Sequence, residues 1–265
     1  MQTTDAKTED SLYEVRDGIA FLTFNRPQSY NALTFEMYDR LADVCAMANA
    51  DRSIRAMVLT GAGGKAFAAG TDIAQFRSFR GPDDALAYEA RIERVLAALE
   101  ECRVPTLAAI AGACTGGGLG IAACCDIRIG ADNARFGMPI ARTLGNCLSL
   151  SNYARFADLV GTARLKEMIF TARLITAQEA QAIGLVSEIV EGPERLLARA
   201  EELARTIASH APLTLQASKR ALRRLRPDVP PNEGSDIVLM CYMSRDFREG
   251  MEAFLTKRAP QFTGE

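Results

Sequence analysis

The sequence predicts one α/β unit, because short apolar segments alternate with amphipathic helical segments along most of its 265 residues. Residues 12–24 alternate in polarity around Asp17-Gly18, a dipeptide that favours a hairpin between two antiparallel strands. Residues 106–123, TLAAIAGACTGGGLGIAA, predict a strand, a small-residue loop and the start of a helix. After Pro193 the pattern is almost wholly helical to Arg258.

The first half of the chain supplies two amphipathic helices and one further strand. Thr34 is expected to cap a helix that places apolar residues on one face: Met37, Leu41, Val44, Cys45 and Ala48. A strand at residues 55–60 ends at a GAGG turn, and residues 66–70 are again small. A second helix at residues 84–101 repeats the apolar residues Leu86, Ile92, Leu96 and Leu99.

The second half continues the alternation. We expect strands at residues 127–129 and around Phe136, then helices near residues 148–160 and 163–170. Thr176 and Glu179 have the spacing of a capping box ahead of a short helix. Gly184-Leu185-Val186 is expected to begin another strand.

Composition and net charge disfavour several classes of function. The 48% hydrophobic and 24% charged residues are ordinary for a globular domain, and a net charge of −2 gives no sign of nucleic-acid binding. No apolar run has membrane-spanning length, and residues 1–11 are expected to form a disordered leader that is not a signal peptide. Seven cysteines in mostly apolar segments and one histidine favour reduced thiols in a cytoplasmic protein without a metal site.

Two loops of small residues, KAFAAGTDI at residues 65–73 and the segment at residues 112–120, follow strands and lead into helices. Bare backbone there lets N–H groups approach a ligand closely, and a helix N-terminus favours negative charge. If the two loops face each other, they can direct two N–H groups at one oxygen, as in an oxyanion hole. The three glycines at residues 116–118 can equally serve close packing, so both interpretations stay open.

A series of motifs resembles the enoyl-CoA hydratase/isomerase, or crotonase, family from about Leu12 to Phe262. In order they are NRP at 25–27 with NAL at 31–33, KAFAAGTDI at 65–73, the glycine segment, CDIR at 125–128 with ARFG at 134–137, TAQEA at 176–180, GLV at 184–186, and EGM at 249–251 with Ala253-Phe254 and Lys257-Arg258. The resemblance implies a spiral of ββα units in a core at residues 12–195. It also implies a helical trimerisation section at residues 196–265, and hence a homotrimer or a dimer of trimers.

The family resemblance also implies an acyl-CoA thioester as substrate, with coenzyme A as part of that substrate and no separate cofactor. The thioester oxygen would lie between the backbone N–H groups of Thr71 and Gly117. The positions expected to line the CoA moiety are Ala66, Ala68, Asp72 and Ile73, joined by Phe254 and Lys257 of a neighbouring subunit.

The two glutamates that hydratases of this family use are both missing. The first follows GGG-x, where this chain has Gly120, and the second follows FG-x-P, where it has Ile140, or Ala141 if the one extra residue is placed earlier. Each acid–base group typically contributes about 10²- to 10⁴-fold, so ordinary hydratase activity is expected to be very slow. Two alternatives stay open: a different reaction (isomerisation, decarboxylation or thioester hydrolysis), or a non-catalytic acyl-CoA-binding homologue.

Few side chains offer a replacement for the lost glutamates. Arg142 can bind a carboxylate on the acyl group if it faces the pocket, and the same segment carries Asn146, Cys147 and Ser149. Glu89 and Glu93 lie on the helix at residues 84–101 and are expected on its solvated face. Without a nearby histidine Cys147 is expected in the core, and His210 is expected to cap a helix or lie on the surface.

Two nucleotide-binding patterns fit poorly. Gly118-x-Gly120-x-x-Ala123 loosely matches a dinucleotide fingerprint, but it does not follow a strand directly and no acidic residue ends a second strand about 20 residues later. Lys65 follows glycines as in a phosphate-binding loop, but the next residue is Ala66 in place of Ser or Thr.

Overall fold

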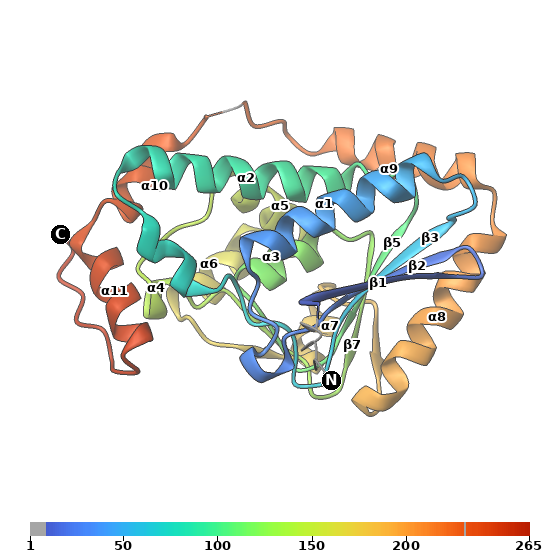
Figure 1. Ribbon diagram of the computed structural model, residues 1–265, viewed down its shortest axis with the longest axis horizontal. Helices are drawn as coiled ribbons and strands as arrows, with labels where there is room; N and C mark the ends of the chain where they lie inside the picture. Colours follow the sequence, from blue (N-terminus) through green and yellow to red (C-terminus); the bar gives the residue numbers. More distant parts are fainter. Residues whose placement is uncertain (1–8, 231) are drawn as a thin grey trace, which may run out of the picture.

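The computed structural model describes residues 9–230 and 232–265, so most of the expected leader at residues 1–11 lies outside the described residues. The first strand, β1, already begins at Ser11. Figure 1 shows a central sheet with α1 and α2 along one side and α8 along the other. The α/β class predicted from the sequence is confirmed.

A six-stranded sheet forms the centre of the fold, in the order β1-β2-β3-β5-β7-β10. Its strands are β1 (Ser11–Arg16), β2 (Ile19–Phe24), β3 (Ala56–Gly61), β5 (Thr106–Ile110), β7 (Ile127–Ala131) and β10 (Glu188–Val190). The predicted hairpin pairs β1 and β2 antiparallel, and the other neighbours pair in parallel.

A smaller four-stranded sheet has the order β4-β6-β8-β9. Its strands are β4 (Ala66–Ala68), β6 (Ala113–Thr115), β8 (Arg135–Gly137) and β9 (Ile175–Thr176). Residues 113–115 were expected in a loop, and that expectation is wrong. Three small residues show no apolar alternation, and β6 is stabilised by pairing with β4 and β8, which are remote in sequence.

The helices complete a repeating ββα pattern, in which each repeat adds one strand to each sheet: β3-β4-α2, then β5-β6-α3, then β7-β8 followed by further helices. This is the spiral that the family resemblance implied. The helices are η1 (Pro27–Ser29), α1 (Phe35–Ala50), η2 (Ile73–Ser78), α2 (Pro82–Glu100), α3 (Gly117–Cys124), α4 (Ile140–Thr143), α5 (Leu150–Val160), α6 (Thr162–Phe170), α7 (Ala177–Ala182), α8 (Pro193–Ser209), α9 (Pro212–Leu225), α10 (Ser235–Tyr242) and α11 (Arg245–Leu255).

Local signals fixed two helix starts as predicted. The Thr34 hydroxyl accepts a hydrogen bond from the Met37 N–H at the start of α1. Thr176 and Glu179 form the expected capping box of α7.

Alternate residues of the central strands face two different apolar layers. Leu22 and Leu59 pack with α1 and α2, whereas Phe21 and Val58 pack with the buried face of α8, which presents Leu196, Ala200 and Ala204. The domain boundary expected between residues 195 and 196 therefore falls inside α8. Because α8 covers the sheet, it belongs with the core, and the C-terminal section begins after it.

The C-terminal section comprises α9, α10 and α11. It is less continuously helical than expected, because residues 226–230 form no regular element. Figure 1 shows α10 and α11 at one end of the molecule, where α10 contacts α2 and α11 contacts η2 and α4. The helix α9 buries no residue of its own and exposes Leu213, Leu222 and Leu225.

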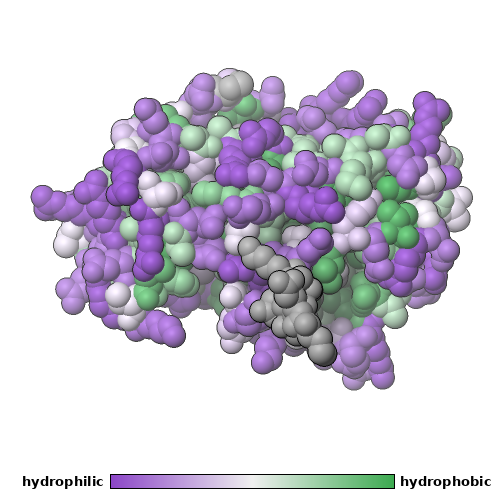
Figure 2. Space-filling view, in the orientation of Figure 1, coloured by the Kyte–Doolittle hydropathy of each residue, from purple (hydrophilic) through white to green (hydrophobic). Residues whose placement is uncertain are grey.

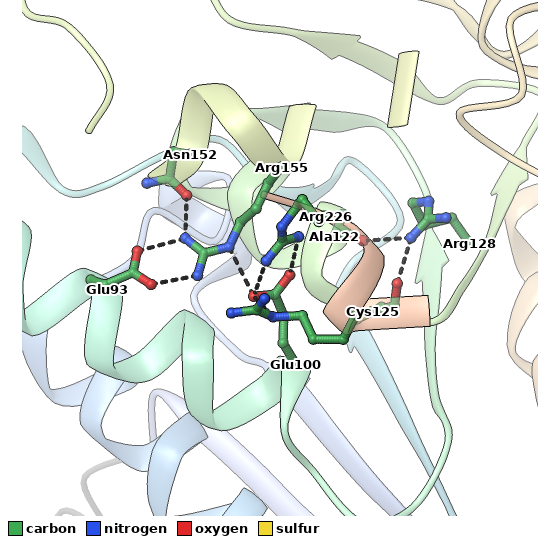
Figure 3. Close-up of polar contacts among 9 residues, drawn as sticks. Glu93, Glu100, Ala122, Cys125, Arg128, Asn152, Arg155 and Arg226 are labelled. Atoms are coloured by element: carbon green, nitrogen blue, oxygen red, sulfur yellow. Dashed lines mark hydrogen bonds and ion pairs between the residues drawn. The ribbon is translucent and has the colours of Figure 1, made fainter. Parts of the chain in front are cut away.

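A buried ion cluster ties this section to the core (Figure 3). Arg155 on α5 donates to Glu93 and Glu100 on α2, and Arg226, just after α9, donates to both oxygens of Glu100. The Arg155 side chain is only 2% exposed, so removing one partner would leave an uncompensated buried charge. The cluster therefore fixes α5 and the residues after α9 against α2.

The surface is mainly polar on the face drawn in Figure 2, with apolar side chains in small patches. Among the described residues no helix combines the length and the apolar character needed to cross a bilayer.

Candidate functional site

A cavity of about 530 Å³ opens between the two small-residue loops, α2, α4 and α10. Its wall includes Thr71 and Gly117 from the loops, Tyr88 and Glu89 from α2, and Tyr242 from α10. The cavity therefore brings together segments that lie far apart in the sequence.

The two loops face each other directly. A Cβ atom on Gly116 would lie 3.4 Å from Gly70 Cα, and one on Gly70 would lie 4.0 Å from Gly117 N. Leu33 bonds to the residues on either side of Thr71, donating to Gly70 O and accepting from Asp72 N, each at 2.8 Å. Within the described part of the chain the N–H groups of Thr71 and Gly117 have no protein acceptor, so both are available to a ligand.

Glycine is required at each of positions 116–118, and the physical cause differs from one position to the next. Gly116 has a φ of +53°, which side chains rarely adopt. A Cβ on Gly117 would lie 2.0 Å from Tyr38 Oη, and one on Gly118 would lie 2.2 Å from Ala68 O. Close packing and backbone exposure, the two interpretations left open by the sequence, therefore both apply.

A line of three hydroxyl groups borders the loops. Thr71 Oγ1 lies 2.9 Å from Tyr38 Oη and 3.0 Å from Tyr88 Oη. Burial raises the pKa of both tyrosines, so their hydroxyls stay protonated at neutral pH. These bonds hold the Thr71 side chain in one position beside its backbone N–H.

Glu89 lies in the cavity wall, and the expectation that it is on a solvated face is wrong. Its Oε1 accepts a 2.8 Å hydrogen bond from the Tyr242 hydroxyl. Burial raises the Glu89 pKa to about 7, opposed by the Tyr242 hydrogen bond and assisted by the charge of Glu93. The reason is tertiary: α10 packs on α2, where Tyr242 contacts Tyr88 and Glu89 and covers that face.

The helical periodicity of the sequence already indicated that Glu89 lies on the buried face of α2. Ala85, Ile92 and Leu96 form the buried stripe of α2, and position 89 falls on that stripe at spacings of four and three residues. A carboxylate at an apolar position requires either a partner or a function. Glu93 has a partner instead, since it is paired with the buried Arg155.

The positions of the two absent glutamates differ in their surroundings. Ile140 is buried and lines the cavity. Gly120 is buried in α3 and is not part of the cavity wall; a Cβ atom there would meet nothing closer than Leu96 Cδ1 at 3.9 Å.

The residues predicted to contact CoA divide into two groups. Asp72, Ile73 and Phe254 line the cavity, and Asp72 also pairs with Arg26 at 3.0 Å and accepts from Ala74 N at the start of η2. Phe254 lines the cavity of its own chain, where α11 packs on η2 and α4. Its contact with CoA bound to a neighbouring subunit stays a prediction.

Ala66, Ala68 and Lys257 do not line this cavity. Ala66 and Ala68 are buried in β4 between β6 and the core, and Lys257 is exposed after α11. Contacts of these residues with CoA stay predictions.

The segment after Ile140 lines the cavity as expected through Arg142, Asn146 and Cys147. Arg142 is exposed on α4, and Asn146 Nδ2 donates to Tyr242 Oη at 3.3 Å. Cys147 is buried, and the neighbouring Cys241 together with burial raises its pKa, which disfavours a nucleophilic thiolate.

Two further candidates are not among the residues that line the cavity. Ser149 precedes α5, and its side-chain hydrogen bond to Glu89 acts to lower the pKa of that carboxyl. His210 follows α8, where its carbonyl accepts from Arg55. Among the described residues no group of three or more His, Cys, Asp or Glu side chains is placed to hold a metal ion.

Comparisons with known proteins show the family and the fold. The sequence profile of the enoyl-CoA hydratase/isomerase family matches residues 14–265. A crotonyl-CoA hydratase of Syntrophomonas wolfei is 34% identical over 257 residues, which cover 96% of this chain and 98% of that protein.

Solved structures of the same kind superpose along nearly the whole chain. An enoyl-CoA hydratase/carnithine racemase from Magnetospirillum magneticum has 36% identity and a TM-score of 0.79, covering 97% of this chain and 96% of that one. A methylmalonyl-CoA decarboxylase in complex with 2-nitronate-propionyl-CoA has 30% identity and a TM-score of 0.87, covering 97% and 99%.

Proposed function

This chain belongs to the enoyl-CoA hydratase/isomerase family, and we propose that it catalyses proton transfer beside the carbonyl of an acyl-CoA thioester, with Glu89 as the proton-transfer group. One observation carries the proposal: Glu89 lines the same cavity as the unpaired N–H groups of Thr71 and Gly117. The two N–H donors and the Glu89 carboxyl therefore border the same cavity.

The two N–H groups supply the electrostatic part of the reaction. Removing a proton from the α-carbon of a thioester places negative charge on the carbonyl oxygen. Donors that fit this enolate oxygen better than the ground-state carbonyl lower the barrier by about 3 kcal/mol each. Thr71 is held for this task by the hydrogen bonds on either side of it.

Glu89 is suited to accept and return the proton. A pKa of about 7 leaves a substantial fraction ionised at neutral pH while keeping the carboxylate basic. Asp72, the other acidic residue among those that line the cavity, is engaged by Arg26 and by the start of η2.

Among the reactions open to such a site, we propose isomerisation of the acyl double bond. One carboxylate can remove a proton from the α-carbon of a 3-enoyl thioester and deliver it to the γ-carbon, which moves the double bond into conjugation. Hydration in this family uses two carboxylates, and this chain has Gly120 and Ile140 at those positions. The residues present therefore fit a one-carboxylate reaction better.

Incubation in heavy water tests the proposal. The protein is mixed with 3-hexenoyl-CoA or with crotonyl-CoA, and the products are followed by mass spectrometry. We expect conversion of the first substrate to the conjugated thioester with deuterium incorporation, and little hydration of the second. Hydration of crotonyl-CoA without isomerisation would refute the choice of reaction.

A non-catalytic acyl-CoA binder is the alternative, since it needs the two loops but no carboxylate. Binding of both thioesters with neither turnover nor deuterium exchange would establish it.

We also propose how the chain assembles. The exposed leucines of α9 favour assembly into a homotrimer or a dimer of trimers, which size-exclusion chromatography with light scattering measures. We also propose that the protein is cytoplasmic and needs no cofactor beyond the CoA of its substrate.

A further inference from the structure

The three hydroxyls beside the oxyanion site share too few acceptors for all their protons. Tyr38, Thr71 and Tyr88 each carry one hydroxyl proton, and the two contacts at 2.9 and 3.0 Å use two of the three. One proton is therefore free to bond elsewhere.

Burial of Tyr38 decides the donor of the first contact. Tyr38 is 1% exposed and does not line the cavity, so its proton is satisfied only by donating to Thr71 Oγ1. The second contact can run in either direction, since a hydroxyl oxygen can accept twice. With Thr71 as its donor and Tyr88 Oη as its acceptor, the proton left over is that of Tyr88, whose side chain forms part of the cavity wall.

The hydroxyl line lies against both oxyanion donors. A Cβ atom on Gly117 would lie 2.0 Å from Tyr38 Oη and 3.1 Å from Thr71 Oγ1, so these hydroxyls abut Gly117 as well as the Thr71 N–H. The Tyr88 hydroxyl lies 3.0 Å from Thr71 Oγ1, so it directly neighbours the residue that carries one of the two N–H groups.

The Tyr88 ring is held by its packing. Its centroid lies 5.0 Å from that of Phe76 and 5.7 Å from that of Phe35, with Tyr242 at 6.2 Å. A donor held in place before the substrate binds needs little reorganisation in the transition state. Two hydroxyls in series also polarise the third and strengthen it as a donor.

We propose that the Tyr88 hydroxyl donates a third hydrogen bond to the thioester oxygen, in addition to the N–H groups of Thr71 and Gly117. Tyr88 is then a catalytic residue that stabilises the enolate, while Glu89 beside it on α2 moves the proton. This inference rests on the proposed function, because it requires a thioester carbonyl at that position.

The test compares Tyr88→Phe with the wild type in two measurements. Phenylalanine keeps the ring and its aromatic contacts but removes the donor. We expect the rate of deuterium incorporation into the bound thioester to fall on the order of 10²-fold. In infrared spectra of bound crotonyl-CoA labelled with carbon-13 at the thioester carbonyl, we expect the carbonyl band to move back toward its position in free solution.

Tyr153→Phe is the matched control, since Tyr153 lies on α5 and does not line the cavity. A wild-type rate and an unchanged carbonyl band in Tyr88→Phe would overturn the inference. Glu89→Gln separates the two proposals: it should abolish exchange while leaving the carbonyl band shifted. A wild-type protein that shows no carbonyl shift with bound thioester would overturn the oxyanion site itself, and this inference with it.

Discussion

The Tyr242 hydroxyl on α10 donates a 2.8 Å hydrogen bond to Glu89 Oε1 on α2, across a separation of 153 residues. Asn146 Nδ2 donates in turn to Tyr242 Oη at 3.3 Å. The C-terminal section therefore completes the cavity and fixes the carboxylate that we assign to proton transfer. A chain ending before α10 would keep both small-residue loops but would leave Glu89 without this partner.

Replacing Glu89 with Gln should slow turnover strongly while preserving thioester binding. The amide retains the shape of the side chain but cannot accept a proton, so we expect a loss of about 10²- to 10⁴-fold in deuterium incorporation. The measurement is isotope exchange by mass spectrometry, with calorimetry for binding. Glu101→Gln is the control, because Glu101 is an exposed residue at the end of the same helix. Exchange at the wild-type rate in Glu89→Gln would exclude this carboxylate as the base.

Replacing Tyr242 with Phe should move the pH dependence of the reaction to higher pH. The Tyr242 hydrogen bond lowers the Glu89 pKa, whereas burial raises it to about 7. Removing the hydroxyl removes its lowering effect on the Glu89 pKa. That pKa therefore rises further, and the carboxylate forms only at higher pH. The initial rate measured against pH reports this shift, and Tyr153→Phe should leave the profile in place. An unmoved profile would show that Tyr242 has no part in tuning the carboxylate.

The raised Glu89 pKa also predicts a stability difference with a defined sign. In the unfolded chain the pKa is near 4.5, and in the folded protein it is about 7. Between these values the folded state binds more protons, so the stability contributed by the neutral carboxyl is present below about pH 4.5 and is lost as the pH rises through about 7.

Glu89→Gln removes this dependence. The variant should therefore exceed the wild type in free energy of unfolding by up to about 3 kcal/mol near pH 8, relative to their difference near pH 5. Urea unfolding of both proteins at the two pH values measures the change, and other titrating groups cancel in the comparison. A difference that is the same at both pH values would contradict the raised pKa.

Local signals predicted most of the fold, and long-range contacts account for what they missed. Thr34 and Thr176 start helices through bonds to residues three positions away, and such spacings are visible in the sequence. The strand at Ala113–Thr115 is visible only through its pairing with β4 and β8.

The sequence likewise predicted part of the candidate site and missed another part. The two loops follow from small residues at strand ends, and the choice of Thr71 and Gly117 within them follows from the family resemblance, although only the structure shows that the loops meet. Glu89 was expected in solvent, because a charged residue on a helix usually faces water and α10 is remote in sequence. The burial of positions 85, 92 and 96 around it was the available signal.

The glycines of α3 predict opposite effects of the same substitution two residues apart. In Gly118→Ala the new Cβ would lie 2.2 Å from Ala68 O, so α3 must move away from β4, and we expect a loss of about 1–3 kcal/mol in the free energy of unfolding. In Gly120→Ala the nearest atom is Leu96 Cδ1 at 3.9 Å, so the methyl group fits, and the higher helix propensity of alanine should add up to about 1 kcal/mol.

Urea unfolding of the two variants checks this contrast, and each serves as the other's control because both change one glycine of one short helix. Equal destabilisation by both would contradict the space that the structure shows at Gly120. The contrast also bears on the proposed reaction, since Gly120 is the residue at which the family resemblance predicts the first glutamate. A side chain fits there as far as its Cβ, so packing at that atom does not require glycine, and the missing carboxylate is consistent with a reaction that depends on Glu89.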